Sequence, residues 1–111
     1  MIKCYHARKN DNNEVIAPLV ATINADSAEL EDLWDCCNNS CWWDGIDYAS
    51  MTDYKDKFGV EFTSEYWGYC NDDLIVEMQG QFYVALSFGW DCFSSFEEAL
   101  NHCKKDSYWC Q

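Results

Sequence analysis

Residues 74–88 read LIVEMQGQFYVALSF and contain the clearest structural signal in the chain. Two runs rich in apolar and aromatic residues, Leu74 to Met78 and Gln81 to Phe88, flank the dipeptide Gln79-Gly80. Runs of this kind are typical of strands, and a glycine-containing pair between them is typical of a tight turn. The segment therefore predicts an antiparallel hairpin.

A helix that ends near Lys105 is predicted after this hairpin. Ser94 or Ser95 can cap its start. Glu97 or Glu98 then completes a capping box. The apolar residues that repeat at i, i+3, i+4 and i+7 are Phe96, Ala99, Leu100 and Cys103.

The first third of the chain predicts a similar unit. Strand-like residues run from Ile2 to Arg8 and from Val15 to Ile23, and the polar cluster from Lys9 to Asn13 forms a turn between them. Pro18 interrupts the second run. It requires an edge position or a bulge, because proline cannot donate a hydrogen bond to the strand ladder. We predict an opening antiparallel hairpin.

A first helix follows this opening hairpin. The segment Asp26-Ser27-Ala28-Glu29 has the form of a helix start, in which an N-cap acid is followed three residues later by glutamate. The residues spaced at i, i+3, i+4 and i+7 are Leu30, Leu33, Trp34 and Cys37. We expect the first three of them to face the core. The acids on the opposite face are Glu29, Glu31, Asp32 and Asp35.

Together these elements predict an α+β fold, formed by a single compact acidic domain over residues 1–111. Its mainly antiparallel sheet comes from two hairpins, and two helices pack on it. An irregular aromatic and acidic segment lies between Asn38 and Asn71. Within that segment the residues allow a short helix near Thr52 to Phe58, ended by Gly59, or a strand from Val60 to Phe62.

Positive charge is missing from most of the chain. The formal net charge is -13 at pH 7, and there is no lysine or arginine from Asn10 to Tyr54 or from Phe58 to Cys103. A field of one sign attracts oppositely charged partners and repels nucleic acid and anionic lipid. We therefore expect a protein partner with a basic surface, and no direct contact with nucleic acid or membrane.

The eight cysteines are expected to be reduced thiols of a cytoplasmic protein. The chain opens without an apolar run of signal-peptide length, and no segment approaches the roughly 20 apolar residues that span a bilayer. No C-x2-C pair occurs. Cys37 and Cys103 lie on apolar helix stripes, where burial explains them better than metal binding. We predict no metal and no other cofactor.

No catalytic arrangement is recognisable in the sequence. A cysteine nucleophile needs a base, and His102 precedes Cys103, but consecutive helical residues do not face each other. His6 lies in no catalytic motif. Pairs of carboxylates arise by chance among 20 acids. We therefore expect that the protein is not an enzyme.

Acids and tryptophans supply a candidate partner-binding surface. Trp42, Trp43 and Trp67 interleave with acids in the irregular segment. Burial against the sheet is one interpretation of these tryptophans, and anchoring of a partner is the other, because tryptophan is common at binding hot spots. The full candidate set consists of Glu29, Glu31, Asp32, Asp35, Trp42, Trp43, Asp44, Asp47, Glu65, Trp67, Asp72 and Asp73.

In size, acidity and mixed α+β layout, the chain resembles the small phage-encoded inhibitors of bacterial defence, which include anti-CRISPR and antirestriction DNA-mimic proteins. Its segment from Asp73 to Trp90 also looks like a hairpin found in small phage-encoded proteins of unknown function. The resemblance implies a non-enzymatic inhibitor in the host cell cytoplasm. Such an inhibitor would occupy a basic nucleic-acid-binding site of a defence nuclease or CRISPR effector complex, by DNA mimicry or charge complementarity.

A second hypothesis comes from a different class of protein. The chain could be a phage-type interaction or assembly protein that binds a protein partner through its Trp/Tyr-rich segment, with its acidity serving solubility. This hypothesis predicts that changing Trp42 and Trp43 abolishes binding while neutralising acids has little effect.

Overall fold

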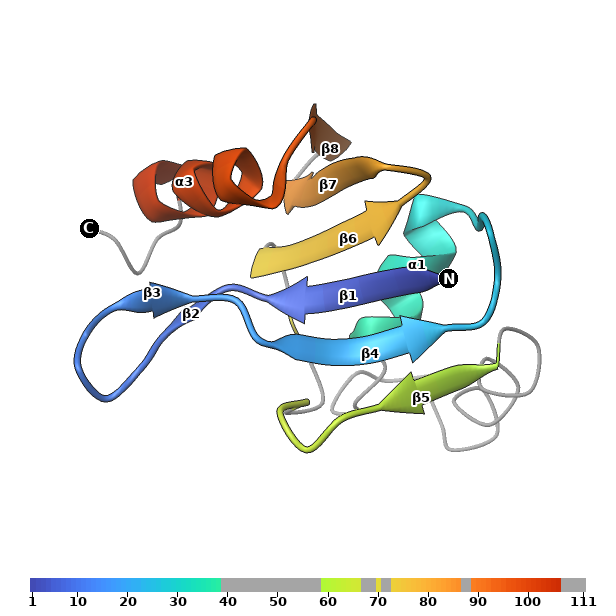
Figure 1. The fold of residues 1–111 in the computed structure, drawn as a ribbon, viewed down its shortest axis with the longest axis horizontal. Coiled ribbons are helices and arrows are strands. Elements are labelled where there is room, and N and C mark those ends of the chain that lie inside the picture. The colour runs from blue at the N-terminus through green and yellow to red at the C-terminus, as the bar shows by residue number, and fades with distance from the viewer. Residues whose placement is uncertain (39–58, 67–69, 71–72, 87–88, 107–111) are drawn as a thin grey trace.

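The computed structural model describes residues 1–38, 59–66, 70, 73–86 and 89–106, and within them an antiparallel sheet forms the centre of the fold. The strand order is β5-β4-β1-β6-β7-β8 (Figure 1). Every neighbouring pair in this sheet is antiparallel. The strands are β1 (Ile2–His6), β4 (Leu19–Ile23), β5 (Val60–Phe62), β6 (Leu74–Met78), β7 (Gln81–Leu86) and β8 (Gly89–Phe93).

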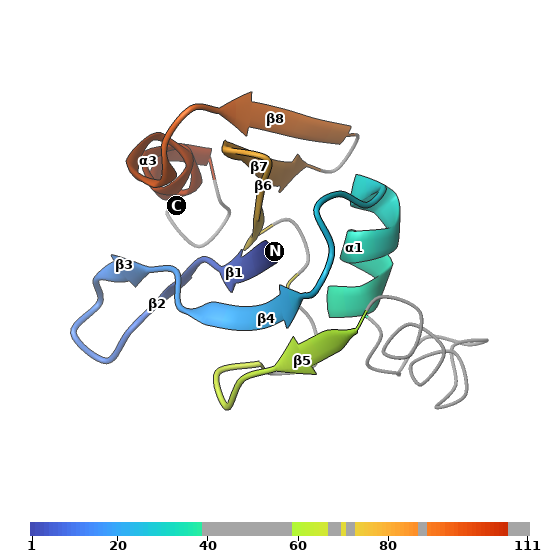
Figure 2. The same cartoon turned by 45° about the vertical axis from the view of Figure 1, so that its right-hand side comes forward.

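Helices α1 (Leu30–Cys37) and α3 (Phe96–Asp106) cover opposite faces of the sheet. On β6, Leu74 and Val76 join the core beneath α1, whereas Ile75 between them joins the core beneath α3. Successive strand residues point to opposite faces, so this alternation assigns one helix to each face. Figure 2 shows the sheet between the two helices.

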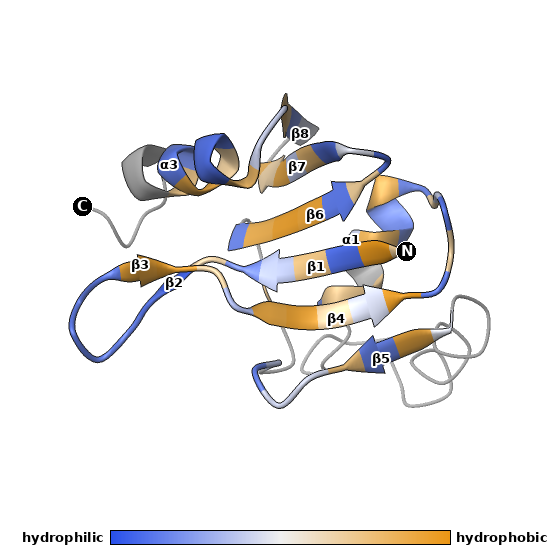
Figure 3. Cartoon of the chain, viewed as in Figure 1, coloured by the Kyte–Doolittle hydropathy of each residue, from blue (hydrophilic) through white to orange (hydrophobic). Residues whose placement is uncertain are grey.

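Because both faces are covered, the central strand is apolar almost throughout. Leu74, Ile75 and Val76 are all fully buried. A strand buried on both faces reads as a continuous hydrophobic run instead of an alternating one. Figure 3 shows this concentration of hydrophobic residues in the central strands and a hydrophilic loop between β2 and β3.

The opening hairpin continues beyond the main sheet as a two-stranded arm. Its strands are β2 (Arg8–Lys9) and β3 (Val15–Ile16), which pair antiparallel (Figure 1). The predicted second strand is broken between β3 and β4, where Pro18 lies and its carbonyl accepts a hydrogen bond from the His6 backbone N–H at 3.1 Å. Proline has no N–H to donate, which accounts for the break.

The turn that joins β6 and β7 is as short as the sequence predicts. Met78 pairs with Gln81, so Gln79 and Gly80 are the only loop residues. Their φ angles are 53° and 77°. Two central residues with positive φ match the twist of an antiparallel pair, and glycine adopts such a φ without steric cost.

Several sequence predictions need correction. The sheet of two hairpins is not confirmed, because the sheet also contains β5 and β8. Of the two alternatives in the irregular segment, the strand Val60–Phe62 is present, while residues 52–58 lie outside the described residues. The strand predicted to reach Phe88 is described only to Leu86.

The start of α1 is also different from the prediction. The helix begins at Leu30 and its N-cap is Glu29, not Asp26. The Ala25 backbone N–H bonds to the Ile23 carbonyl, and the Ala28 backbone N–H bonds to Met78 Sδ at 3.4 Å. These contacts hold the segment before Glu29 in a non-helical path, so tertiary contacts override the capping pattern.

Candidate functional site

Helix α1 presents the part of the predicted partner-binding surface that the structure describes best. Leu33 is fully buried in the core, and Leu30 and Trp34 pack against that core, as predicted. On the other side, Glu29 and Glu31 are exposed. The amphipathic spacing therefore places the apolar stripe inward and leaves carboxylates at the solvent.

The carboxylates of Glu29, Glu31 and Asp32 are not neutralised by neighbouring bases within the described residues. The last turn contains no basic residue, and neither of the ion pairs found there involves an α1 acid. The Trp90 indole on β8 donates a hydrogen bond from Nε1 to Glu31 Oε1 at 3.2 Å. A neutral donor leaves the charge of the carboxylate intact, so this face keeps its negative field.

Asp32 is half-buried on the same helix, and Asp35 lies within the bounds of α1. Two other predicted acids fit an exposed, unpaired surface less well. Glu65 is exposed, but it forms an ion pair with Arg8, whose guanidinium also donates to the Glu65 carbonyl at 2.9 Å. Asp73 is only 8% exposed, so it adds little to an exposed surface.

The remaining predicted site residues belong to parts of the chain that the structure leaves undescribed. The structure therefore places Glu29, Glu31 and Asp32 on or next to one helix. Glu65 differs from them because it is paired with Arg8, and Asp73 differs because it is buried. The structure does not describe the others. Those others are Trp42, Trp43, Asp44, Asp47, Trp67 and Asp72.

A group of four buried cysteines lies beneath α1, and the sequence analysis did not predict that they would meet. All four belong to the same core cluster, although they come from distant parts of the chain. They are Cys4 on β1, Cys36 and Cys37 on α1, and Cys70. Spacing gave no signal for this group, because long-range contacts cannot be read from residue intervals.

The pKa values of two of these thiols, Cys4 and Cys70, are raised, which favours their protonated form. A hydrogen bond with Cys37, followed by burial, raises the pKa of Cys4 well above its ordinary value. Burial is the main cause that raises the pKa of Cys70, and the nearby Cys37 and Asp73 raise it further. Because the thiolate is the reactive form, neither thiol is activated as a nucleophile at neutral pH.

The two histidines occupy different environments. Burial, assisted by the positive charge of Arg8, lowers the pKa of His6 to about 4, so this side chain is neutral at pH 7. His102 lies on α3, where Nε2 is 3.6 Å from Asp91 Oδ2 and the ring centroid is 5.2 Å from that of Phe93. Cys103 next to His102 is buried in the core beneath α3, as its helix position predicts.

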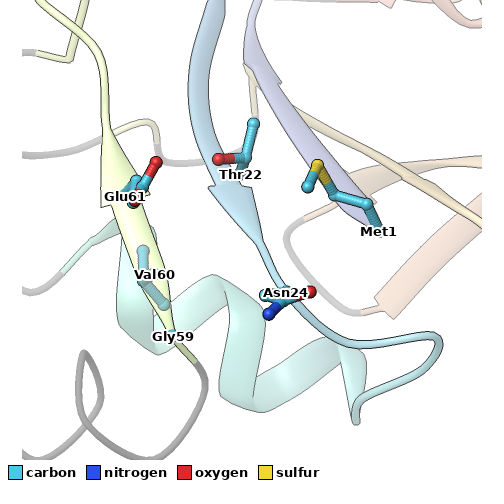
Figure 4. A pocket seen from close by; sticks show the side chains of 6 residues that line it. All are labelled: Met1, Thr22, Asn24, Gly59, Val60 and Glu61. Atoms are coloured by element: carbon cyan, nitrogen blue, oxygen red, sulfur yellow. The ribbon is translucent and has the colours of Figure 1, made fainter.

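A pocket of about 460 Å³ lies between the chain start and strands β4 and β5 (Figure 4). Among the described residues, its lining contains neither cysteine nor histidine, and Glu61 is the only charged side chain of that part of the lining. The residues that line it are Met1, Thr22, Asn24, Gly59, Val60 and Glu61. Within the described lining, Glu61 therefore has no second acidic or basic side chain with which to form an acid–base pair.

Two further kinds of feature are absent from the described residues. Within them, no group of three or more histidine, cysteine or acidic side chains is arranged to hold a metal ion. None of the helices in that part of the chain is long and apolar enough to cross a membrane.

No family model, curated protein or solved structure matches this chain.

Proposed function

We propose that this protein is a non-enzymatic inhibitor that binds a basic nucleic-acid-binding site of a bacterial defence nuclease or CRISPR effector complex. Contact is made by carboxylates that substitute for phosphates, through DNA mimicry or charge complementarity. The acidic face of α1, which consists of Glu29, Glu31 and Asp32, is the described part of the contact surface. No chemical step is required, because occupancy of the basic site is sufficient for inhibition.

The observation that carries this proposal is that, within the described residues, no base forms an ion pair with Glu29, Glu31 or Asp32 on α1. Acids one turn apart repel each other, and natural helices commonly place a base at that spacing. Here Glu31 and Asp35 occupy such positions, and the last turn of α1 has no base. The net charge of -13 extends the same bias over the whole chain. Repulsion between these acids lowers the stability of the helix, and this loss of stability is readily explained when the charge itself is used for binding.

The first test is affinity capture from a bacterial lysate at low and moderate salt, followed by competition with duplex DNA. The proposal expects a nucleic-acid-handling complex that DNA and salt both displace. Each ion pair lost from the interface weakens the salt dependence of binding. We therefore expect the triple variant Glu29→Gln, Glu31→Gln, Asp32→Asn to weaken binding on the order of tenfold or more.

A matched control changes the same total charge elsewhere. Asp11, Glu14 and Glu97 are all exposed, and none of them lies on α1. The variant Asp11→Asn, Glu14→Gln, Glu97→Gln should retain most of the affinity and of the salt dependence. If both triple variants behaved alike, bulk charge and not the α1 face would govern binding.

A different outcome would support the second hypothesis. A salt-resistant partner without a nucleic-acid role, lost on changing Trp42 and Trp43 but not on neutralising the α1 acids, would assign the contact to the aromatic segment. In that case the negative charge would serve solubility, and the inhibitor proposal would be wrong.

A further inference from the structure

Strand β8 is the last strand of the sheet, and one of its two backbone edges has no neighbour within the described residues. The strand order gives it β7 as its single strand partner there. Figure 2 shows β8 at the top of the view, with no other described strand beyond it. Among the described residues, no backbone hydrogen bond of positions 89–93 reaches outside the β7–β8 pair. Alternate residues of β8 therefore direct N–H and C=O groups away from the sheet.

The opposite edge of the sheet is a shorter template for strand addition. Strand β5 has three residues, whereas β8 has five. All five are in register with β7, from Gly89 to Phe93. A longer regular edge offers more backbone hydrogen bonds to an added strand. Of the two edges, β8 is therefore the better one for a further strand.

Acidic side chains lie on both faces of the sheet at β8. Trp90 packs against the core beneath α1, and its indole hydrogen bond to Glu31 places that carboxylate beside β8 on this face. Asp91 lies opposite Val84, a residue of the core beneath α3, so Asp91 belongs to the other face. The Asp91 side chain is 48% exposed, and its Oδ2 is 3.6 Å from His102 Nε2. The side chains of an added strand alternate between the same two faces, so each set meets a carboxylate.

The chain around β8 is acidic and poor in bases. Strands β7 and β8 and helix α1 contain no lysine or arginine. Glu97 and Glu98 are exposed in the first turn of α3, which follows β8. The nearest bases in the sequence are Lys104 and Lys105, toward the other end of α3. Charge complementarity therefore favours an added strand that carries positive charge.

We propose that β8 binds an extended, lysine- or arginine-rich segment of a partner protein, which joins the sheet as a further strand. Backbone hydrogen bonds with β8 hold the segment, and its bases meet Glu31 on one face and Asp91 on the other. A second copy of this chain is a poorer occupant, because each copy has a net charge of -13 and Asp91 lies at the centre of β8. Strand addition at β8 does not depend on the proposed inhibitor function, because the backbone of a different element makes the contact.

The test uses the full chain and a synthetic peptide that alternates lysine and threonine. Isotope-labelled protein is saturated with this peptide at moderate salt, and amide hydrogen exchange is measured by NMR with and without it. We expect alternate amides of positions 89–93 to exchange roughly tenfold more slowly in the complex, because they become hydrogen-bonded. The amides of β5 should keep their rates.

Two control peptides separate strand addition from attraction to an acidic surface. A peptide that alternates glutamate and threonine has the same backbone and the opposite charge, and it should not bind. The lysine–threonine peptide with methylated backbone nitrogens keeps its charge but has no N–H to donate, so it should not protect β8. Equal protection of β8 by the methylated peptide would overturn the proposal.

A double variant tests the two carboxylates. Glu31→Gln, Asp91→Asn should weaken binding of the lysine–threonine peptide on the order of tenfold, because each face loses one charge. The glutamine retains an oxygen that can accept from the Trp90 indole. The matched control Asp11→Asn, Glu14→Gln removes the same charge from exposed positions between β2 and β3, and it should retain the affinity.

The wild-type exchange map decides the proposal even if a variant does not fold. Absence of binding, or protection confined to β5 or α1, would overturn it. Protection of β8 in the free protein that grows with protein concentration would also overturn it, because a second copy would then be the occupant. None of these outcomes bears on capture of a nucleic-acid-handling complex through α1, so the two proposals can fail separately.

Discussion

The two faces of the central sheet are built by different means. The core beneath α3 is formed mainly by aliphatic and aromatic residues, and within the described residues it contains one cysteine, Cys103. The core beneath α1 contains four cysteines, together with aliphatic residues from β1, β4 and β6. Cysteine behaves as a small hydrophobic residue when buried, so both faces exclude water, and they differ in how much of the core is cysteine.

The two helices also differ in their local signals. Helix α3 begins directly after Ser95, whose Oγ accepts a hydrogen bond from the Glu98 backbone N–H at 3.2 Å, and the sequence places Lys104 and Lys105 near its end. Helix α1 has neither a side-chain cap nor a base in its last turn. The sequence of α3 favours a helix by itself, whereas α1 depends on the core that it covers.

The strongest test of this comparison uses neighbouring residues of β6. Leu74 points to the α1 face and Ile75 to the α3 face, and both are fully buried. We expect Leu74→Ala and Ile75→Ala each to lower the free energy of unfolding by about 2–5 kcal/mol, because each leaves a cavity. Urea denaturation followed by circular dichroism measures both values.

The two wild-type side chains are isomers, so the difference between the variants reports how well each face collapses around the missing atoms. A loss below about 1 kcal/mol for Ile75→Ala would contradict a packed core beneath α3. The conservative variant Ile75→Val is the control, and it should cost about 0.5–1.5 kcal/mol.

This comparison also explains how much of the fold could be predicted. The β6–β7 hairpin and α3 were predictable, because the Gln79-Gly80 turn and the Ser95 cap are encoded within a few residues. The capping box was only partly correct, since the Glu98 carboxylate accepts from the Ser94 hydroxyl at 3.2 Å. Strand β8 was missed, because its residues alternate poorly in hydropathy and most are half-buried.

The candidate site was less predictable than the fold. The acids of α1 could be placed on one face by helical spacing alone. The pairing of Glu65 with Arg8, 57 positions away, could not, and neither could the burial of Asp73. The four cysteines of the core beneath α1 could not be grouped from the sequence either, because they come from β1, α1 and the position of Cys70, which only the folded chain brings into one core.

The stability of the α1 face should depend on pH through His6. His6 lies opposite Leu74 in the β1–β6 register, so it shares the face of Cys4. Its pKa is lowered to about 4, so the unfolded chain takes up this proton first as the pH falls below about 6.5. The contribution of His6 to stability should therefore fall from pH 6.5 toward pH 4 and level off below it, by at most about 3 kcal/mol and less where water screens the site.

The variant His6→Gln isolates this effect, because the carboxylates titrate in both proteins. The difference in the free energy of unfolding between wild type and variant should change over this pH window and be constant above pH 7. An NMR titration of the His6 imidazole gives the same quantity directly. A midpoint near 6.5 would contradict the buried, neutral histidine.

The smallest expected effects concern the helix starts. Ser95→Ala should lower the free energy of unfolding by about 1 kcal/mol, because the Glu98 N–H loses its acceptor.

Glu29→Asp should raise the free energy of unfolding by about 0.5–1 kcal/mol, because aspartate is a preferred N-cap residue and α1 lacks a side-chain cap. The second change keeps the charge of the acidic face, so stability and charge are separated. Urea denaturation followed by circular dichroism measures both changes, and a Glu29→Asp variant that is less stable than the wild type would contradict the uncapped start of α1.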